Sequence, residues 1–271
     1  MSFRKIAAGV ACWLLALSGG AMALPVNWGT SFQPPVTPVM ERIETFHHEV
    51  FLIITAVCIF VLGLLVWIVI RYNARANPVP SKVSHNTLLE VAWTLIPVII
   101  LVIIAIPSFK LLYYEMTIPK ADVTIRAVGK QWFWTYQYPG AGNMQFDSLG
   151  LSDDKAAAAH EPRLLGVDNP VVVPVNKNVV VETIGSDVIH SWAVPQFGVK
   201  MDAVPGRVNR TWFKATVLGT YYGQCSELCG ARHAYMPIEV KVVSQADYEA
   251  WLAASKKKFA SNGDATQLAA K

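Results

Sequence analysis

The stretch QCSELCGARHAYM, residues 224–236, gathers the most distinctive side chains of the sequence. It places Cys225, Cys229, His233 and Met236 within twelve residues, and His190 lies 35 residues before Cys225. Two thiolates, two imidazoles and a thioether are soft or borderline ligands, and together they suit copper. The stretch therefore predicts a copper centre, and the rest of the chain indicates where that centre is held.

A disulfide between Cys225 and Cys229 is the alternative use of this pair, because extracytoplasmic compartments are oxidising. A bridge that closes so short a loop is geometrically demanding, and it leaves His233 and Met236 without a role. We therefore favour metal ligation over a disulfide.

The number of thiols bears on the number of metal ions. One thiolate, two imidazoles and a weak axial methionine make a single blue-copper site. This chain supplies two thiolates and two imidazoles, enough for two copper ions bridged by both sulfurs. The backbone carbonyl of Glu227, between the cysteines, can supply an oxygen ligand. Such a centre suits electron transfer, because a shared electron requires little rearrangement.

The composition points to a membrane protein. Hydrophobic residues make up 53% of the 271 residues and charged residues only 15%, which is more apolar than an ordinary soluble domain. The net charge is +4 and the basic residues are scattered. Nucleic acid is therefore not an expected partner.

Residues 1–23 have the pattern of a secretory signal peptide. Arg4 and Lys5 precede a short apolar core, and Ala21-Met22-Ala23 is a small-x-small cleavage signal. A third membrane helix is the alternative, but the apolar run is too short for one. The mature chain would then begin at Leu24, with a proline-rich lead before the first membrane helix.

Two apolar runs within residues 24–116 predict transmembrane helices at about 50–70 and about 88–114. The connection from Arg71 to Lys82 is basic and contains no acidic residue, so the positive-inside rule makes it cytoplasmic. The prediction is a multi-pass protein of the cell inner (plasma) membrane with its C-terminal domain on the periplasmic side. Glu90, near the start of the second helix, is either a snorkelling end residue or a proton-path or subunit contact.

From Ala121 onward the apolar runs give way to alternation, which predicts strands. Further strands are predicted around residues 171–173, 179–181, 207–214, 216–222 and 238–243, with a surface loop over 152–168. Residues 121–244 are therefore a β-sandwich or barrel, and residues 245–271 a C-terminal helix and tail. Alternation in the aromatic stretch predicts one face that carries Trp132, Trp134, Tyr136 and Tyr138.

After the signal, the chain resembles subunit II of haem–copper cytochrome c oxidase. The resemblance rests on four motifs: His190-Ser191-Trp192; Gly223 to Gly230 with His233 and Met236; Gly129 to Tyr136; and Glu90 to Thr94. It implies a two-helix transmembrane hairpin followed by an all-β cupredoxin-like Greek-key barrel. It also implies a dinuclear copper centre, CuA, whose ligands are His190, Cys225, the carbonyl of Glu227, Cys229, His233 and Met236.

The resemblance further implies the function of a respiratory, proton-translocating oxidoreductase. The copper centre would accept electrons from cytochrome c and pass them to haem and copper in subunit I, where oxygen is reduced to water; this chain alone would not reduce oxygen. Trp132 would be where the electron enters, Glu90 would lie at the mouth of a proton pathway, and the Glu227 carboxylate would help bind Mg²⁺ shared with subunit I. The implied partners are subunits I and III, cytochrome c and membrane lipid, with haem only in the partner subunit.

Two departures from the family pattern affect the donor-facing surface. The family often has histidine where this chain has Lys130, and an acid where it has Gln137. Both changes make that surface less acidic, so a basic cytochrome would dock less strongly or with less dependence on salt.

Two other functions compete with this one. A copper chaperone also uses Cys-x3-Cys with a distant histidine, but it would have a thioredoxin-like fold of alternating helices and strands. A quinol-oxidising relative would keep the fold and lack the ligands, which are all present here. The chain has no Cys-x-x-Cys-His motif for a fused haem c.

Overall fold

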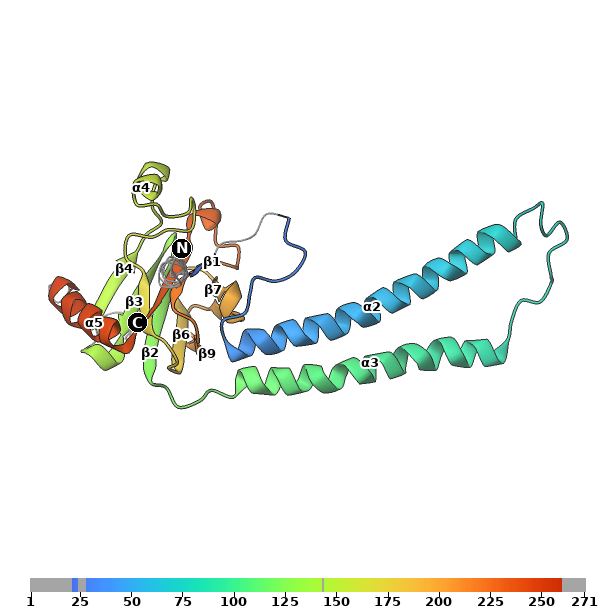
Figure 1. Cartoon of the computed structure of the whole chain (residues 1–271), viewed down its shortest axis with the longest axis horizontal. Coiled ribbons are helices and arrows are strands. Elements are labelled where there is room, and N and C mark those ends of the chain that lie inside the picture. The colour runs from blue at the N-terminus through green and yellow to red at the C-terminus, as the bar shows by residue number, and fades with distance from the viewer. Residues whose placement is uncertain (1–20, 24–27, 143, 260–271) are drawn as a thin grey trace, which may run out of the picture. The chain divides into compact units, whose positions relative to one another are not determined.

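A computed structural model describes residues 21–23, 28–142 and 144–259. The chain divides into two compact units, one formed by Glu41–Thr117 and the other by Met1–Met40 with Ile118–Lys271. Figure 1 shows the first unit as a pair of long helices and the second as a β-domain. The predicted signal peptide lies outside the described residues except for Ala21–Ala23, which form a short strand, β1. Cleavage after Ala23 stays a prediction.

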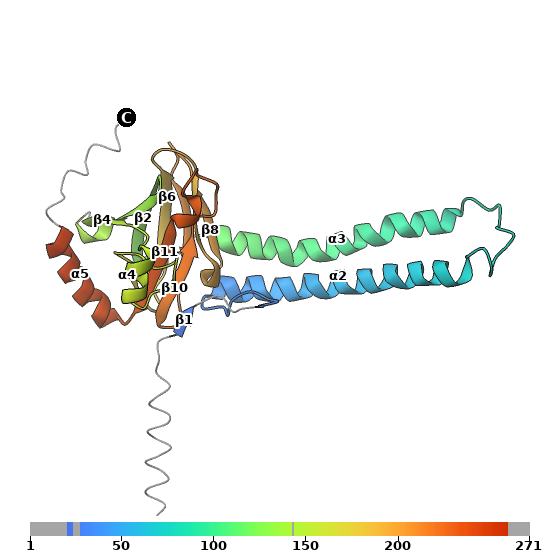
Figure 2. The same cartoon turned by 90° about the horizontal axis from the view of Figure 1, so that it is seen from above.

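The helical unit contains α3 (Thr87–Met116) and all but the first turn of α2 (Pro38–Arg71), and the two helices run side by side in both views (Figures 1 and 2). Both are long and apolar enough to span a membrane. The α2 helix begins at Pro38, well before the predicted apolar span, because proline is favoured in the first helical turn. Asn86 caps α3 by accepting a hydrogen bond from the Leu89 amide.

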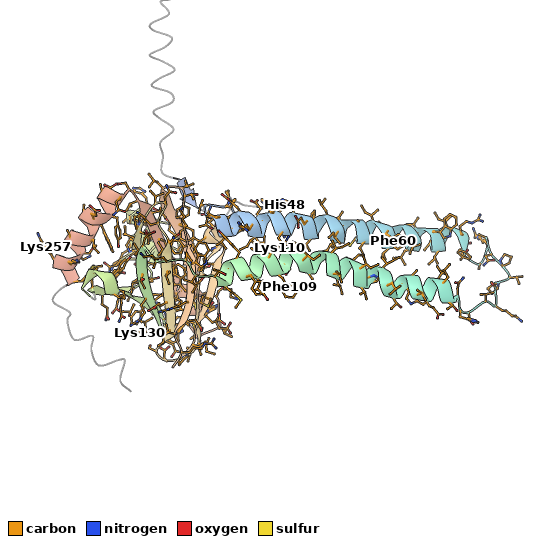
Figure 3. All side chains as sticks on the ribbon, turned by 90° about the horizontal axis from the view of Figure 1, so that it is seen from below. His48, Phe60, Phe109, Lys110, Lys130 and Lys257 are labelled. Carbon is orange, nitrogen blue, oxygen red and sulfur yellow. The ribbon has the colours of Figure 1, made fainter. Side chains whose placement is uncertain are left out.

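Apolar side chains cover the surface of both helices. Phe60 on α2 is 64% exposed and Phe109 on α3 is 57% exposed, and Figure 3 shows both on the outside of the ribbon. Water does not stabilise such a surface, whereas lipid does. Near the start of α2 and the end of α3, the Arg42 guanidinium lies 3.8 Å from the centre of the Tyr114 ring and links the two helices.

The β-domain has two main sheets and a hairpin. The first sheet has the order β4-β3-β2-β6-β9, the second β1-β10-β11-β5, and the hairpin pairs β7 with β8. The strands are β2 (Val123–Lys130), β3 (Phe133–Tyr138), β4 (Met144–Ser148), β5 (Val171–Pro174), β6 (Val179–Gly185), β7 (His190–Val194), β8 (Val199–Ala203), β9 (Asn209–Phe213), β10 (Gly219–Gln224) and β11 (Pro237–Val243).

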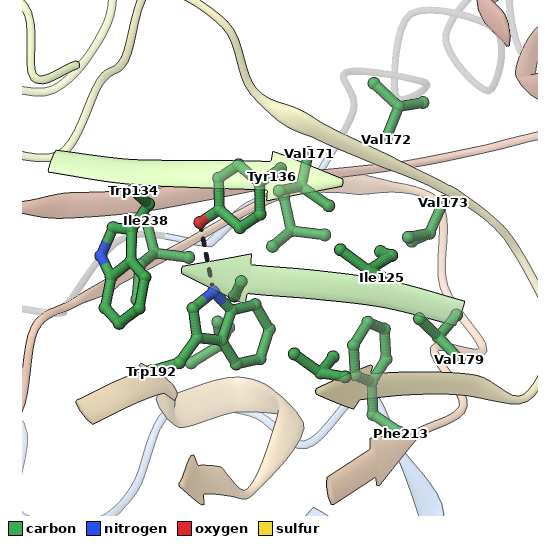
Figure 4. Close-up of a cluster of buried hydrophobic side chains, with 14 of the residues drawn as sticks. Ile125, Trp134, Tyr136, Val171, Val172, Val173, Val179, Trp192, Phe213 and Ile238 are labelled. Atoms are coloured by element: carbon green, nitrogen blue, oxygen red, sulfur yellow. Dashed lines mark hydrogen bonds between the residues drawn. The ribbon is translucent and has the colours of Figure 1, made fainter. Parts of the chain in front are cut away.

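Side chains from both sheets and from β7 form one core (Figure 4). Trp134 and Tyr136 of β3 are fully buried. Within this core the Trp192 indole donates a 3.2 Å hydrogen bond to the Tyr136 hydroxyl, which satisfies a polar group that burial would otherwise penalise. Trp132 departs from the predicted alternation, because it precedes β3 and is only partly buried.

Short helices and one long helix complete the β-domain. They are η1 (Pro139–Ala141), η2 (Pro195–Phe197), η3 (His233–Tyr235), α4 (Asp153–Ala158) and α5 (Gln245–Phe259). The α5 helix packs against β4 and β5. Its Trp251 ring lies 5.3 Å from the Tyr138 ring, and Phe259 stacks 5.0 Å from Phe146. The Ser244 hydroxyl caps α5 by accepting from the Asp247 amide. Residues 260–271 lie outside the described part.

The loop between β4 and β5 is tied to the second sheet by a polar cluster. The Glu239 carboxylate, only 1% exposed, accepts a 3.0 Å hydrogen bond from the Val167 amide and lies 3.2 Å from the Lys241 amine. The Tyr222 hydroxyl donates to Glu161 at 2.6 Å. Burial raises the pKa of Glu239, although Val167 and Lys241 oppose the shift.

Glu239→Gln tests this cluster through the pH dependence of stability. The folded protein holds a proton on Glu239 more tightly than the unfolded chain does, because its pKa is raised. The stability from this group is thus present below the ordinary glutamate pKa and lost as pH rises through the raised value. Glutamine still accepts from Val167 and does not titrate. We expect the melting temperature of the variant, relative to the original protein, to rise as the pH increases above the ordinary glutamate pKa of about 4.3.

The exposed Glu249 on α5 provides the matched control for this experiment. Glu249→Gln should show no comparable pH-dependent difference in melting temperature. A Glu239→Gln variant that loses stability relative to the original protein as pH rises would contradict the assigned direction of the pKa shift.

Candidate metal centre

The second sheet and the β7–β8 hairpin bring together the chain segments that carry the predicted ligands. β10 ends directly before Cys225, β11 begins directly after Met236, and β7 begins at His190. The Cys225 amide donates to the Met236 carbonyl at 3.0 Å, and the Ser226 amide donates to the Ser191 carbonyl at 3.0 Å. These backbone bonds fasten the cysteine loop to the start of β11 and to β7.

Each thiol has an imidazole of its own. The Sγ atom of Cys225 lies 3.9 Å from Nδ1 of His190, and the Sγ atom of Cys229 lies 3.6 Å from Nδ1 of His233. The two sulfurs are 3.8 Å apart, and the Glu227 carbonyl oxygen is 3.4 Å from Sγ of Cys225. The sulfurs are therefore not joined as a disulfide, whose bond is about 2.05 Å long.

The donor set fits a thiolate-bound metal. Two sulfurs 3.8 Å apart can both bind the same ion, because a zinc–thiolate bond, for example, is about 2.3 Å long. The ligand atoms of His190, Cys225 and Cys229 lie within 4.8 Å of one another, and all three residues are buried. Met236 is also fully buried, whereas the side chain of Glu227 is exposed.

The site is arranged to hold one thiolate before any metal binds. Burial would raise the pKa of Cys225, but hydrogen bonds with His190 and with backbone groups outweigh it and lower the pKa to about 6. Burial, together with the charge on Cys225, raises the pKa of the Cys229 thiol. Because metal ligation requires both thiolates, metal binding would displace the proton from Cys229.

Asp187 orients the first imidazole. Its Oδ1 lies 2.8 Å from Nε2 of His190, which leaves Nδ1 facing Cys225. A carboxylate on the outer nitrogen of a ligating histidine fixes ring orientation and raises ligand basicity. The positioning role of Asp187 depends on this side-chain contact, which the sequence alone did not reveal.

Gly129 leaves the space that the His190 ring occupies. A Cβ atom at residue 129 would lie 2.6 Å from Cδ2 and 2.9 Å from Cβ of His190. Because His190 is fully buried, its ring cannot turn into solvent to avoid that clash. Glycine at this end of β2 is therefore required by the close approach of the histidine.

Gly129→Ala is expected to displace His190 and weaken metal binding by about 10- to 100-fold, the range found when groups that orient a ligand are altered. Competition with a copper chelator measures that change. Gly140→Ala is the control, because a Cβ there has no atom within 4 Å, and its affinity should be unchanged. Equal affinities for Gly129→Ala and the original protein would show that the space at residue 129 does not control how His190 binds the metal.

Trp132 lies against the backbone of the second cysteine. Its indole Nε1 donates to the Cys229 carbonyl at 3.2 Å, and the side-chain amide of Gln131 donates to the same oxygen at 2.8 Å. Next to them, the Lys130 amine lies 5.3 Å from the centre of the Phe133 ring, and Lys130 is labelled in Figure 3. The partly buried indole thus connects the domain surface with a predicted metal ligand.

Glu90 belongs to the helical unit. It lies in the first turn of α3, and the Glu90 amide donates to the carbonyl of the capping residue Asn86 at 3.0 Å. The metal centre belongs to the other unit, and the predicted role of Glu90 in a proton pathway stays a prediction.

Comparisons with known proteins cover both units. Residues 25–111 match the family described as "Cytochrome C oxidase subunit II, transmembrane domain", and residues 123–243 match "Cytochrome C oxidase subunit II, periplasmic domain". A probable cytochrome c oxidase subunit 2 of Rickettsia conorii is 49% identical over 268 residues, which cover 99% of this chain and 84% of the relative. Cytochrome c oxidase subunit 2 of Cereibacter sphaeroides is 45% identical, over 84% of this chain and 80% of the relative.

A solved structure resembles the β-domain. The periplasmic domain of subunit II of cytochrome oxidase of Bradyrhizobium japonicum is 57% identical, with a TM-score of 0.50, and the match covers 53% of this chain and 99% of that domain.

The fold and the site define a class of protein, a cupredoxin-like β-domain on a membrane anchor with a buried cysteine–histidine cluster that can bind copper. Matches to both units narrow this class. The chain belongs to the cytochrome c oxidase subunit II family. It is a membrane subunit of an oxidoreductase complex, and the expected fold class is confirmed. The thioredoxin-like fold expected for a copper chaperone is not what the β-domain has.

Proposed function

We propose that the centre holds two copper ions bridged by both cysteine sulfurs. The observation that carries this proposal is the pairing of each thiol with a separate imidazole, around sulfurs 3.8 Å apart. The ligands would be His190, Cys225, the Glu227 carbonyl, Cys229, His233 and Met236. Copper bound in this way would supply a one-electron carrier with a delocalised charge.

The residues of the site keep that carrier shielded from solvent. His190 is fully buried, and Cys225 and Cys229 are 5% and 3% exposed. Asp187 holds the His190 ring from the outer side, so the ring keeps its orientation when the charge of the centre changes. A buried centre with every donor supplied by the protein favours electron transfer over binding of a substrate.

Trp132 is the proposed point at which the electron enters from cytochrome c. Its indole contacts the carbonyl of Cys229 and reaches the domain surface. The electron would then pass to the haem and copper of subunit I, where oxygen is reduced to water. Lys130 beside Trp132 makes this surface less acidic, so salt should weaken docking less than for an acidic surface.

Two carboxylates are proposed to act at the boundary with subunit I. The Glu227 carbonyl faces Cys225 while its side chain is exposed, so its carboxylate is free to help bind Mg²⁺, a hard cation that prefers oxygen ligands. Glu90 would lie at the entrance of a proton pathway into subunit I. Subunit III would complete the complex.

The copper domain is proposed to lie on the periplasmic side of the inner membrane. The connection between α2 and α3 carries Arg75 and Lys82 and no acidic residue, which supports a cytoplasmic position for it. A cleaved signal over residues 1–23 would agree with this orientation.

The proposed function is tested by mixing the copper-loaded full chain with reduced cytochrome c and following the cytochrome spectrum. We expect one electron to be accepted per chain, because two bridged ions share it. A chain that a small chemical reductant reduces, and cytochrome c does not, would contradict the assigned donor.

A further inference from the structure

Gln131 makes two hydrogen bonds to different parts of the site. Its backbone amide donates to Oδ2 of Asp187 at 2.7 Å, and its side-chain amide donates to the Cys229 carbonyl at 2.8 Å. These partners lie 56 and 98 residues away in the sequence. Gln131 therefore joins the chain segment that orients His190 to the segment that contains Cys229, and Trp132 is its immediate neighbour.

We propose that Gln131 is a positioning residue that holds the Trp132 indole against the Cys229 carbonyl for electron transfer to the centre. This inference rests on the proposed function of Trp132. Neither the residue's type nor its place beside an aromatic stretch suggested such a role, because both of its contacts arise from tertiary structure.

The contact made by Trp132 alone is weak. Its 3.2 Å hydrogen bond lies at the long end of the range for N–H donors, whereas the Gln131 bond to the same oxygen is 2.8 Å. Because the two residues are adjacent, anchoring Gln131 at both backbone and side chain restricts where the indole can lie. Transfer rates fall steeply with separation, so a small displacement of the indole slows the reaction.

The cysteine loop closes around this pair of donors. A Cβ atom at Gly230 would lie 3.1 Å from Nε2 of Gln131 and 3.1 Å from Cζ2 of Trp132, and Gly230 has a φ of +120°. The loop therefore approaches both side chains so closely that glycine is favoured. Such close contact indicates that the amide and the indole are held in a defined arrangement.

Asp187 connects the same arrangement to the other thiol. Its two carboxylate oxygens are divided between the Gln131 amide and the His190 ring. A shift of Gln131 would thus change the contact of Trp132 with the Cys229 carbonyl, and through Asp187 it would also change the position of the His190 ring. Removal of only the side-chain amide keeps the backbone bond to Asp187 and isolates the Trp132 side.

Gln131→Leu removes the side-chain donor at similar size and is tested in the copper-loaded full chain. We expect reduction by cytochrome c to slow by about three- to tenfold, the range that loss of one neutral hydrogen bond produces. Copper content, the visible spectrum and the rate with a small chemical reductant should be unchanged. Gln245→Leu is the control, because the exposed Gln245 side chain donates to Glu249 on α5 at 2.8 Å and has no proposed role in the site; its rate should be normal.

A double-mutant cycle with Trp132→Phe separates positioning from a general structural effect. If Gln131 acts through the indole, Gln131→Leu should have little further effect once Trp132 is replaced. An unchanged rate in Gln131→Leu, loss of copper in that variant, or full multiplication of the two effects would each overturn the inference. If Trp132→Phe itself reacts normally, the proposed route through Trp132 fails, and the inference falls with it.

Discussion

Cys225→Ser is expected to abolish the copper centre. The Cys225 sulfur lies within 4 Å of Nδ1 of His190, the Glu227 carbonyl oxygen and the Cys229 sulfur, so it contacts more of the proposed donor set than any other side chain described. A hydroxyl is a hard and weakly acidic replacement for a bridging thiolate. The loss should exceed the roughly 10- to 100-fold effects of altering groups outside the ligand set.

Metal analysis and the visible spectrum of the purified variant measure this effect. Cys58→Ser is the matched control, because Cys58 is an exposed cysteine on α2 and the same chemical change there removes no proposed ligand. It should keep full copper content. Retention of two copper ions by Cys225→Ser would show that its sulfur does not bridge them.

Trp132→Ala is expected to slow reduction by cytochrome c by at least about tenfold, which corresponds to about 1.4 kcal/mol in the activation barrier. Alanine removes the indole that connects the domain surface to the Cys229 carbonyl. Copper content should be intact, because Trp132 supplies no proposed ligand. Stopped-flow reduction of the copper-loaded chain provides the rate.

Trp28→Ala is the control for loss of a tryptophan, since Trp28 is 98% exposed and has no proposed role in the centre. It should react at the normal rate. A normal rate in Trp132→Ala would remove Trp132 from the electron path and leave the copper ligands unaffected.

The ligand set could be predicted from sequence because most of it is local. Cys225, Cys229 and His233 follow one another at intervals of four residues, and the choice of soft donors already points to copper. The two membrane helices could also be predicted from sequence, because a helix that spans the membrane is the expected structure of so long an apolar run. Only the polar start of α2 lay outside the predicted span, since it carries no hydropathy signal.

The supporting residues could not be predicted, because their roles depend on contacts between distant strands. Gln131 and Cys229 are 98 residues apart, and the pairing of the sheets alone decides that they meet. The closeness of Gly129 to His190 has the same origin.

The face of an alternating strand was predicted only in part. Trp134, Tyr136 and Tyr138 do share a buried face, but Trp132 lies before the strand and is only partly buried. For Glu239 the strand was predicted but the burial of the side chain was not. The loop between β4 and β5 contacts Glu239 through the Val167 amide, and no pattern within the strand predicts that a distant loop will bury this residue.

The number of copper ions per chain tests the account most directly. Metal analysis and electron spin resonance of the purified full chain, after copper loading and partial reduction, should give two ions per chain and a mixed-valence signal with one electron shared between them. One copper ion per chain, or a metal-free protein with Cys225 and Cys229 joined in a reducible disulfide, would contradict the dinuclear centre.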